Sequence, residues 1–341
     1  MNVLGIDTSC DDTAAAVVRD GREVLASVVA SQTGLHERWG GVVPEIACRA
    51  HVESLLPVVE EALAKAGTPL AQVDAVAVTT HPGLIGALLV GVAAAKALAF
   101  ALGKPLIGVD HIEAHVVANR LAAQELETPF ISLIVSGGHT ELFLYRGTGD
   151  KDLLGKTRDD AAGEAFDKVA SLLSLAYPGG PSVERAARGG SPSAIDFPRP
   201  DLGGGSLDFS FSGLKTAVLY HLKGQDGRRD APGAGAPLDE RRIADIAASF
   251  QEAAVDQLVA RVRRAVKATG IPRAAVGGGV AANGRLREKL EAAGRKHRFA
   301  VFFPPRALCT DNAAMVAALA YENLKAGRGV AEDLDVEARA R

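Results

Sequence analysis

The chain has 341 residues, of which 48% are hydrophobic, so it is long enough for two domains of about 150 residues each and for a sizeable buried core. Its formal net charge of −3 argues against binding nucleic acid through bulk charge alone. Its three cysteines, Cys10, Cys48 and Cys309, are dispersed and form no C-x-x-C pair, which argues against a disulfide framework or a cysteine zinc site and favours a reduced, cytoplasmic protein.

The first part of the chain alternates strand and helix patterns. Short apolar runs predict strands at Val3–Asp7, Thr13–Arg19 and Glu23–Ser31. A helix, a strand, a helix, a strand and a helix follow, over residues 45–65, Val73–Thr79, Leu84–Leu102, Leu106–Val109 and Ile112–Gln124. The order is therefore three strands, then helix and strand in alternation, ending on a helix.

One of these helices, Leu84–Leu102, is apolar enough to raise the question of a membrane span. It is rich in Gly and Ala, contains Lys96 and lies between two strand patterns, so we predict a buried helix in a protein without membrane association. The chain opens on a strand pattern with no basic leader or cleavage pattern, so we expect no secretion.

The same element order recurs in the rest of the chain. The predicted elements are strands at Ile131–Ser136, Glu141–Arg146 and Leu153–Thr157, a helix at Gly163–Leu175, and, after an insertion, a helix at Arg242–Thr269, a strand at Ala274–Gly277, a helix at Arg285–Ala293, a strand at Phe299–Phe303 and a helix at Asn312–Lys325. Two such halves imply two layered α/β domains that face a cleft. This organisation resembles the duplicated actin, Hsp70 and sugar-kinase superfamily, the ASKHA or ribonuclease H-like fold.

We predict an N-terminal lobe over residues 1–127, with the C-terminal helix of residues 311–341 as a candidate to pack back on it, and a C-terminal lobe over residues 128–310. The second lobe carries an insertion at about residues 177–239 with a high Gly and Pro content, and its last segment, Gly224–Pro237, is predicted to be a surface loop. Within it, Asp208–Lys215 alternates aromatic and serine residues, which predicts a strand that leads into a helix beside a ligand.

Three turns are candidates to hold a nucleotide. In the superfamily, the turn after the first strand of each half holds phosphates, and here these turns are Thr8–Asp12 and Ser136–Thr140. A third segment, Gly277–Asn283, joins a strand to a helix, and its glycines allow a flat ligand to approach the backbone. Free N–H groups at the helix start favour anionic atoms, and Asn283 suits a ribose hydroxyl or a base edge.

A metal site is predicted from His111 and His115, which are four residues apart at the start of a helix and so share one face. Asp311, directly before a later apolar helix, is the candidate third ligand. The metalloprotease motifs are absent, because Ile112 and Ala114 occupy the positions where those motifs carry Glu.

Other charged residues have ordinary explanations as well as functional ones. Asp159 and Asp160 precede a helix, where acids cap the first turn, whereas Asp167 and Lys168 lie deeper and are candidates to face the cleft. The basic runs Arg261–Arg264 and Arg295–Arg298 leave local RNA contact open, although a solvated helix face explains each run alone.

A series of motifs makes the chain resemble the TsaD (also called Gcp) family, which makes threonylcarbamoyladenosine in tRNA. The matching stretches are Gly5–Thr13, Gly40–Glu45, His111–His115, Leu133–Thr140, Asp159–Lys168, Tyr177–Pro181, Phe209–Thr216, Gly278–Asn283 and Cys309–Asn312. They keep the family's order over nearly the whole chain. The resemblance implies transfer of the threonylcarbamoyl group from threonylcarbamoyl-AMP to N6 of adenosine 37 in tRNAs that read codons starting with A.

The resemblance also implies roles for single residues. His111, His115 and Asp311 match the ligands of one divalent metal ion, with Fe²⁺ favoured over Zn²⁺. The positions that match substrate-holding residues are Ile134, Val135, Ser136, Gly137, Gly138, Asp167, Gly180 and Asn283, with Glu184 as a weaker candidate. Because N6 of adenine is a weak nucleophile, a further hypothesis is that Asp11 or Asp12 accepts its proton.

The implied partners are tRNA, an inactive paralogue of the same fold and a small ATPase, while a separate synthase supplies the adenylate. The helix around Ile46–Ala66 is a candidate surface for the paralogue, with a core helix as the alternative. Departures from the family pattern are Asp12 in place of Glu, Ala114 in place of Gly, and His81 in place of a small residue. Two alternatives stay open: an ATP-dependent sugar or acid kinase, and a non-enzymatic nucleotide-gated scaffold.

Overall fold

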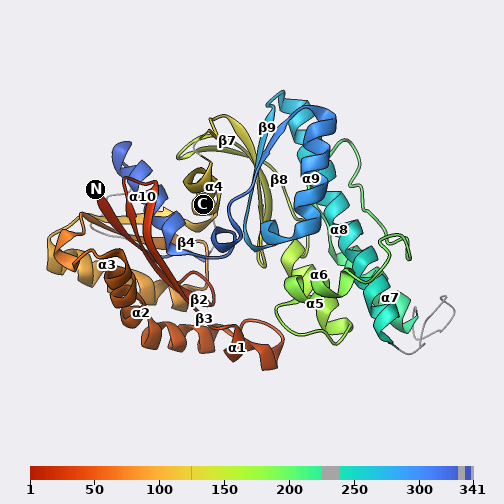
Figure 1. The fold of residues 1–341 in the computed structure, drawn as a ribbon, viewed down its shortest axis with the longest axis horizontal. Coiled ribbons are helices and arrows are strands. Elements are labelled where there is room, and N and C mark those ends of the chain that lie inside the picture. The colour runs from red at the N-terminus through yellow and green to blue at the C-terminus, as the bar shows by residue number, and fades with distance from the viewer. Residues whose placement is uncertain (124, 225–237, 329–334, 339–341) are drawn as a thin grey trace. The chain divides into compact units, whose positions relative to one another are not determined.

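The computed structural model describes residues 1–123, 125–224, 238–328 and 335–338, and the chain divides into two units (Figure 1). Unit 1 comprises Met1–Glu127 and Pro304–Arg341, and unit 2 comprises Thr128–Phe303. The chain therefore leaves unit 1 after residue 127 and returns to it at residue 304, a few residues before the boundary expected at residue 310.

Unit 1 is built on a five-stranded sheet in the order β3-β2-β1-β4-β5. Its strands are β1 (Asn2–Asp7), β2 (Asp12–Arg19), β3 (Glu23–Ser31), β4 (Ala75–His81) and β5 (Leu106–Asp110). The first three pair antiparallel as hairpins, and β4 and β5 add in parallel through helical crossovers. Its helices are α1 (Thr33–His36), α2 (Pro44–Ala66), α3 (Ile85–Leu102), α4 (His111–Ala122) and α10 (Ala313–Lys325).

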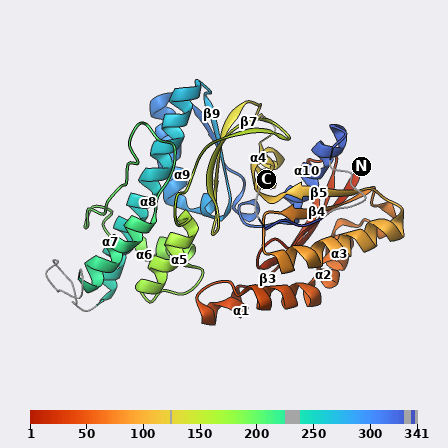
Figure 2. The ribbon, with the colours of Figure 1, turned by 180° about the vertical axis from the view of Figure 1, so that it is seen from behind.

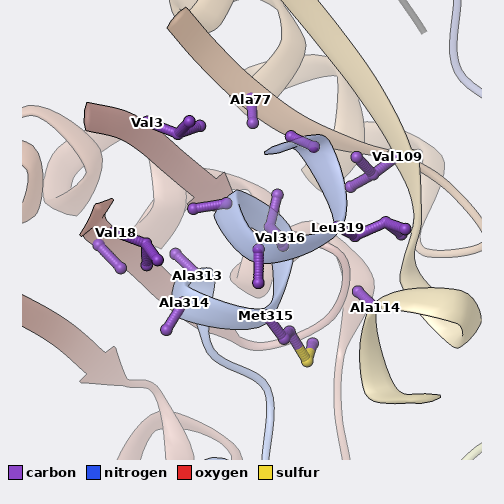
Figure 3. Packing of buried hydrophobic residues seen from close by; sticks show 14 of the residues in the cluster. Val3, Val18, Ala77, Val109, Ala114, Ala313, Ala314, Met315, Val316 and Leu319 are labelled. Atoms are coloured by element: carbon purple, nitrogen blue, oxygen red, sulfur yellow. The ribbon is translucent and has the colours of Figure 1, made fainter. Parts of the chain in front are cut away.

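Both faces of this sheet are covered by helices. Side chains alternate along each strand, so Leu4 and Ile6 of β1 face α2 and α3, whereas Val3 faces α10 and α4. Figure 2 shows α2 and α3 side by side below β4. Figure 3 shows the opposite face, where Ala313, Val316 and their neighbours on α10 pack against the strands and against Ala114 of α4. The last described helix thus completes the core of the first sheet.

Unit 2 repeats this arrangement with a sheet in the order β10-β9-β6-β7-β8. Its strands are β6 (Phe130–Val135), β7 (Thr140–Gly147), β8 (Asp150–Lys156), β9 (Arg273–Gly277) and β10 (Ala300–Phe302). Its helices are α5 (Ala162–Leu172), α6 (Gly179–Ala187), α7 (Ser212–Lys223), α8 (Glu240–Thr269) and α9 (Gly284–His297). Short 3₁₀ turns are η1 (Glu37–Trp39), η2 (Leu70–Gln72), η3 (Gly279–Ala282) and η4 (Arg306–Leu308). If the strands of each unit are numbered in chain order, with β6 as the first strand of unit 2, the two sheets have the same strand order. This agrees with the repeated element order in the sequence.

The surface loop predicted at Gly224–Pro237 lies outside the described residues except for Gly224. The rest of the insertion contains α6 and α7. The strand predicted near residue 208 is reduced to one bridge between Thr157 and Phe209, after which α7 begins.

The predicted burial of α3 is also wrong in part. Among the described helices, it alone is long and apolar enough to span a membrane, by length and composition only. A third of it is buried, in a face that contains Leu88 and Val92 and packs on the sheet. Its outer face leaves Ile85, Leu89 and Phe100 exposed.

Candidate functional site

The candidate metal ligands His111 and His115 lie in the first turns of α4. Asp110 caps this helix by accepting hydrogen bonds from the N–H groups of Ile112 (2.8 Å) and Glu113 (3.2 Å), so the helix begins at His111. The two imidazoles are buried on one face, with ring centroids 4.7 Å apart and planes at 78°. The four-residue spacing therefore places both rings as the sequence predicted.

Asp311 joins the two histidines from a point 196 residues along the chain. Its Oδ1 lies 3.2 Å from His115 Nε2 and 3.4 Å from His111 Nε2. Asn312 fixes the preceding turn by donating to the Thr310 carbonyl (2.8 Å), and it caps α10 by accepting from the Met315 N–H (3.1 Å). The turn, and with it the carboxylate, is thereby held at the start of α10.

Packing between α4 and α10 holds the ligands together. Ala114 of α4 belongs to the same buried cluster as Met315 of α10, and Arg120 forms an ion pair of 2.7 Å with Glu322 further along both helices. One ligand atom from each of the two histidines and Asp311 lies within 4.8 Å of the others. These three residues are therefore a group that can hold a metal ion.

Asp7 and Ser9, which the sequence analysis did not single out, touch the first of these ligands. His111 Nδ1 lies 3.2 Å from Ser9 Oγ and 3.4 Å from a carboxylate oxygen of buried Asp7. Hydrogen bonding of Nδ1 to Ser9 Oγ leaves Nε2, which faces Asp311, as the ring nitrogen available to a metal ion, as in metal-ligating histidines. The signal available in the sequence was an acid at the end of the first strand, where the fold brings it to the start of α4.

The electrostatics of the group suit a cation. Burial by itself lowers the pKa of His111, but the carboxylates of Asp311 and Asp7 outweigh it and hold that pKa well above its ordinary value. Burial raises the pKa of Asp311, but both imidazoles outweigh it and hold that pKa well below its ordinary value. His115 Nδ1 is buried without a hydrogen-bond partner. Two imidazoles and one carboxylate are a donor set for Fe²⁺ or Zn²⁺, so the residues fit such an ion.

The acids of the first turn are Asp11, which directly precedes β2, and Asp12, the first residue of β2. Burial is the main cause that raises the pKa of Asp12 to about 7, with further contributions from Asp311 and Asp11. Burial likewise raises the pKa of Asp11. Asp12 Oδ1 is buried without a hydrogen-bond partner. A carboxyl group with a pKa near neutrality is suited to accept a proton at physiological pH.

In unit 2, the turn Ser136–Thr140 joins β6 to β7. It is closed by hydrogen bonds from the Ser136 N–H to the His139 carbonyl (2.8 Å) and from the His139 N–H to Ser136 Oγ (3.2 Å). A Cβ added to Gly137 or Gly138 meets open space, but one added to Gly163 at the start of α5 falls 2.5 Å from the Ser136 carbonyl oxygen. The turn therefore packs against α5 on one side and is open at its two glycines.

Other glycines divide in the same way between packing and open positions. Gly278 has a φ of +89°, and a Cβ there falls 2.4 Å from the Val135 carbonyl oxygen. Gly179 donates to a carboxylate oxygen of Asp167 at 2.7 Å and lies against the backbone of that residue, whereas Gly180 faces open space. Close packing therefore explains why Gly278 and Gly179 are glycines, but it does not explain why Gly180 is one.

The backbone N–H groups at the start of α9 are less available to a ligand than the sequence predicted. Asn283 is buried, accepts from the Leu286 N–H (3.0 Å) and donates to Gln251 (2.8 Å), so it caps the helix. Glu184 accepts from the Gly284 N–H (3.1 Å). Two of the N–H groups predicted to be free for a ligand are therefore already bonded to side chains.

Asp159 and Asp160 do not cap α5 as predicted. Asp159 accepts hydrogen bonds from the side chains of Ser210 and Ser212 and from the backbone N–H groups of Phe211 and Ser212, at 2.6 to 3.2 Å, so it fixes the start of α7. Asp160 forms ion pairs with Lys168 (3.0 Å) and Lys215 (2.7 Å). Both acids thus bind the insertion to the turn before α5, and Lys168 has a structural partner.

The two basic runs differ in exposure. In the first, Arg261 is buried and donates to backbone carbonyls, and Arg264 pairs with Asp201 at 2.7 Å. The remaining exposed cations form what we call the basic surface: Arg263 and Lys267 of α8, and Arg295, Lys296 and Arg298 at the end of α9. Hydrogen bonding between the Ala300 N–H and the Pro272 carbonyl (2.9 Å) brings the ends of these helices together. Among described residues, the ion pair of this surface is Arg295 with Glu291, at 4.0 Å.

Comparison with known proteins gives a consistent result along the whole chain. The model of the TsaD family, described as tRNA N6-adenosine threonylcarbamoyltransferase, matches residues 23–318. Curated proteins with this same name include one from Syntrophobacter fumaroxidans, 52% identical over 100% of this chain and 99% of its own length. Another, from Symbiobacterium thermophilum, is 54% identical over 98% of this chain and 95% of its own length.

Solved structures with lower sequence identity share the fold. HypF from T. kodakarensis has a TM-score of 0.61 at 17% identity, over 98% of this chain and 49% of that chain. Component A of the (R)-2-hydroxyglutaryl-CoA dehydratase from Acidaminococcus fermentans has a TM-score of 0.54 at 15% identity, over 96% of this chain and 100% of that chain. These likenesses confirm the predicted superfamily fold.

Proposed function

Because the chain belongs to the TsaD family of tRNA N6-adenosine threonylcarbamoyltransferases, we propose that it transfers the threonylcarbamoyl group of threonylcarbamoyl-AMP to N6 of adenosine 37 in tRNAs that read codons beginning with A. The observation that carries this proposal is the full-length match together with the His111–His115–Asp311 group. A kinase of the same fold does not require that group.

We assign one divalent metal ion to these three ligands, Fe²⁺ ahead of Zn²⁺. When bound, the ion supplies Lewis-acid and template chemistry for the carboxylate or hydroxyl of the threonyl group. The chain's own contribution is orientation, since Asp7 and Ser9 fix the His111 ring and the cap at Asn312 fixes the turn that carries Asp311.

The residues proposed to hold the adenylate lie in unit 2. They are Ile134, Val135, Ser136, Gly137, Gly138, Asp167, Gly180 and Asn283. The open surroundings of Gly137, Gly138 and Gly180 support this assignment, because a ligand can approach their backbone N–H groups without meeting a side chain. Asn283 acts through its cap on α9, and Glu184 binds the same helix start.

Little covalent chemistry is required of the protein, because AMP is already a good leaving group in the mixed anhydride. We propose that catalysis relies on positioning and on electrostatic support of the carbamoyl oxygen. Asp12, with its pKa near 7, is the better candidate to accept the N6 proton, and Asp11 is the alternative.

The proposed partners follow from two surfaces. The exposed apolar pairs Val52 and Leu56 on α2 and Ile85 and Leu89 on α3 form an outward apolar surface suited to a paralogue of the same fold. The basic surface on α8 and α9 is suited to tRNA phosphates. A small ATPase and a cytoplasmic location complete the proposal by family analogy.

Single-turnover transfer from preformed threonylcarbamoyl-AMP to unmodified tRNA, in the presence of the partner proteins, tests the proposal. We expect His115→Ala and Asp311→Asn to lose both bound metal and transfer, with metal measured by mass spectrometry and folding by circular dichroism. The matched control His221→Ala removes an imidazole outside the group and keeps both. Phosphoryl transfer from ATP to a sugar or acid, without tRNA modification, would instead identify a kinase.

A further inference from the structure

A buried row of polar side chains lies next to the first turn of unit 1, apart from the metal ligands. His51 of α2 has both ring nitrogens engaged: Nε2 lies 3.0 Å from the Cys10 carbonyl oxygen, and Nδ1 lies 2.8 Å from Thr13 Oγ1. Gln32, just after β3, places its Nε2 3.4 Å from His51 Nδ1 and its Oε1 3.4 Å from Nε2 of His36.

The row ends at the backbone before α2, where the Val43 N–H donates to His36 Nδ1 at 3.3 Å. His36, His51, Gln32 and Thr13 are all buried. Buried polar groups are costly unless they are hydrogen-bonded, and here each has a partner. The side chains therefore form a closed set of contacts from the segment before α2 to the carbonyl of Cys10.

Hydrogen-bond donation along this row must run in one direction, from the Val43 N–H to the Cys10 carbonyl oxygen. A carbonyl oxygen only accepts, so His51 carries its proton on Nε2, and its Nδ1 accepts from Thr13 and Gln32. A backbone N–H only donates, so His36 Nδ1 accepts from Val43, and the proton on its Nε2 goes to Gln32 Oε1. Burial lowers the pKa of His51, which favours this neutral form.

The row meets the turn that carries Asp11 and Asp12. The Gln32 N–H also donates to the Asp11 carbonyl at 3.2 Å, and on the other side the Leu84 N–H donates to the Ser9 carbonyl at 2.9 Å. Ser9 Oγ in turn contacts His111. The peptide held by His51 thus lies between the metal ligands and the acid proposed to accept the N6 proton.

We propose that His51 is a positioning residue for the transfer reaction, which fixes the Cys10 peptide and thereby the directions of the Asp11 and Asp12 carboxyl groups. Gln32 and His36 select the tautomer of His51 that this role requires. The inference rests on the proposed function, because it assigns its role through the acids of that reaction. A purely structural role would affect stability and leave the transfer rate per folded molecule unchanged.

Two substitutions of His51 distinguish the roles of its two ring nitrogens. His51→Gln places an amide N–H near the position of Nε2 and so retains a donor for the Cys10 carbonyl, whereas His51→Asn reaches only to the position of Nδ1. We expect His51→Asn to lower kcat for transfer about tenfold or more, because small misplacements of a reacting group have effects of this order. We expect His51→Gln to retain kcat within about threefold, and both to keep the KM for tRNA and the metal content. His221→Asn, with the same change outside the row, is the matched control.

Nuclear magnetic resonance of ¹⁵N-labelled protein at neutral pH provides a readout that does not depend on transfer. We expect His36 and His51 both to be neutral with the proton on Nε2. A proton on Nδ1 of His51, or a wild-type kcat in folded His51→Asn, would overturn the inference. Absence of transfer by the wild-type protein would count against the proposed function instead, while the tautomer measurement would still test the hydrogen-bonded row.

Discussion

At the scale of single residues, Asp12 shows how burial, together with neighbouring carboxylates, changes the chemistry of a side chain. Its carboxyl group titrates near pH 7 in the folded chain, but in the unfolded chain it titrates near its ordinary value of 3.8. Between these values the folded state holds a proton that the unfolded state has lost. The contribution of Asp12 to the free energy of unfolding therefore falls as pH rises from about 4 to about 7, and it stays low above pH 7.

Replacement of this carboxyl group by an amide gives a test with a defined sign. We expect Asp12→Asn to stabilise metal-free protein relative to wild type, and more at pH 8 than at pH 5. The difference between the two pH values should be at most about 3 kcal/mol, since each pH unit in the window contributes up to about 1.4 kcal/mol. Thermal melts followed by circular dichroism measure it. The same gain at both pH values would show that Asp12 ionises as freely as in the unfolded chain.

Residue patterns predicted the positions of the candidate metal ligands better than they predicted the structural role of Asp159. The spacing of His111 and His115 places two side chains on one helical face, and this depends on local geometry alone. Asp159 was assigned to the wrong helix, because its partners at Ser210 and Ser212 are more than 50 residues away and only the tertiary fold brings them near. Asn283 was predicted to face a ligand because the same side chain suits a helix cap and a ribose contact.

At the scale of elements, the contact between β1 and α10 determines whether the metal ligands assemble. A Cβ on Gly5 would fall 2.3 Å from the Ala313 carbonyl oxygen, in the first turn of α10. We expect Gly5→Ala to displace α10, to reduce the free energy of unfolding by about 2 kcal/mol or more, and to reduce bound metal because Asp311 immediately precedes this helix. Urea denaturation and metal analysis measure these effects.

Gly34→Ala is the matched control for this substitution. It adds the same methyl group in α1, where no atom lies within 4 Å, and we expect a change below about 1 kcal/mol. Equal stability of the two variants would contradict the close packing of α10 on β1.

Hydrophobic periodicity predicted whether a segment is a strand or a helix. It did not predict which side chains are exposed or where the irregular segments lie. Apolar runs located every strand of both sheets, because most strands have a buried face and are bounded by turn residues. Helix α6 was missed, since its Gly- and Pro-rich flanks read as loop, whereas the start of α7 was predicted without its length. The exposed outer face of α3 is nearly as apolar as its buried face, so hydrophobic periodicity did not distinguish the two faces.

At the scale of the whole molecule, the charge is unevenly distributed. The net charge is −3, but five exposed cations gather at the ends of α8 and α9. We expect Arg263→Glu with Lys296→Glu to weaken tRNA binding about tenfold or more at low salt, and to reduce the slope of log K against log salt by about one for each lost phosphate contact. Filter binding across a salt series measures both quantities.

The control for this pair makes the same charge change in unit 1, at Arg22 and Lys104. We expect Arg22→Glu with Lys104→Glu to leave the salt slope within error of wild type. If both pairs of substitutions weakened binding equally, the effect would come from net charge and not from the basic surface.

The duplication of element order could be predicted from the sequence, and the route of the chain between the units could be predicted only in outline. Each unit alternates strands and helices in the same order, so the periodic pattern was enough to indicate the repeat. The chain re-enters unit 1 at Pro304, directly after β10, whereas the sequence pattern placed the boundary at residue 310, just before the last helix.

The route of the chain also imposes an order on its synthesis. A nascent chain that has emerged from the ribosome as far as Phe303 contains all of unit 2, which is one continuous segment, and can complete it. Unit 1, although begun first, still lacks α10, so the apolar surface of its sheet that this helix covers stays exposed until residues 313–325 have been made. Any product that terminates before residue 311 carries the two imidazoles without the carboxylate that completes the candidate metal-ligand group.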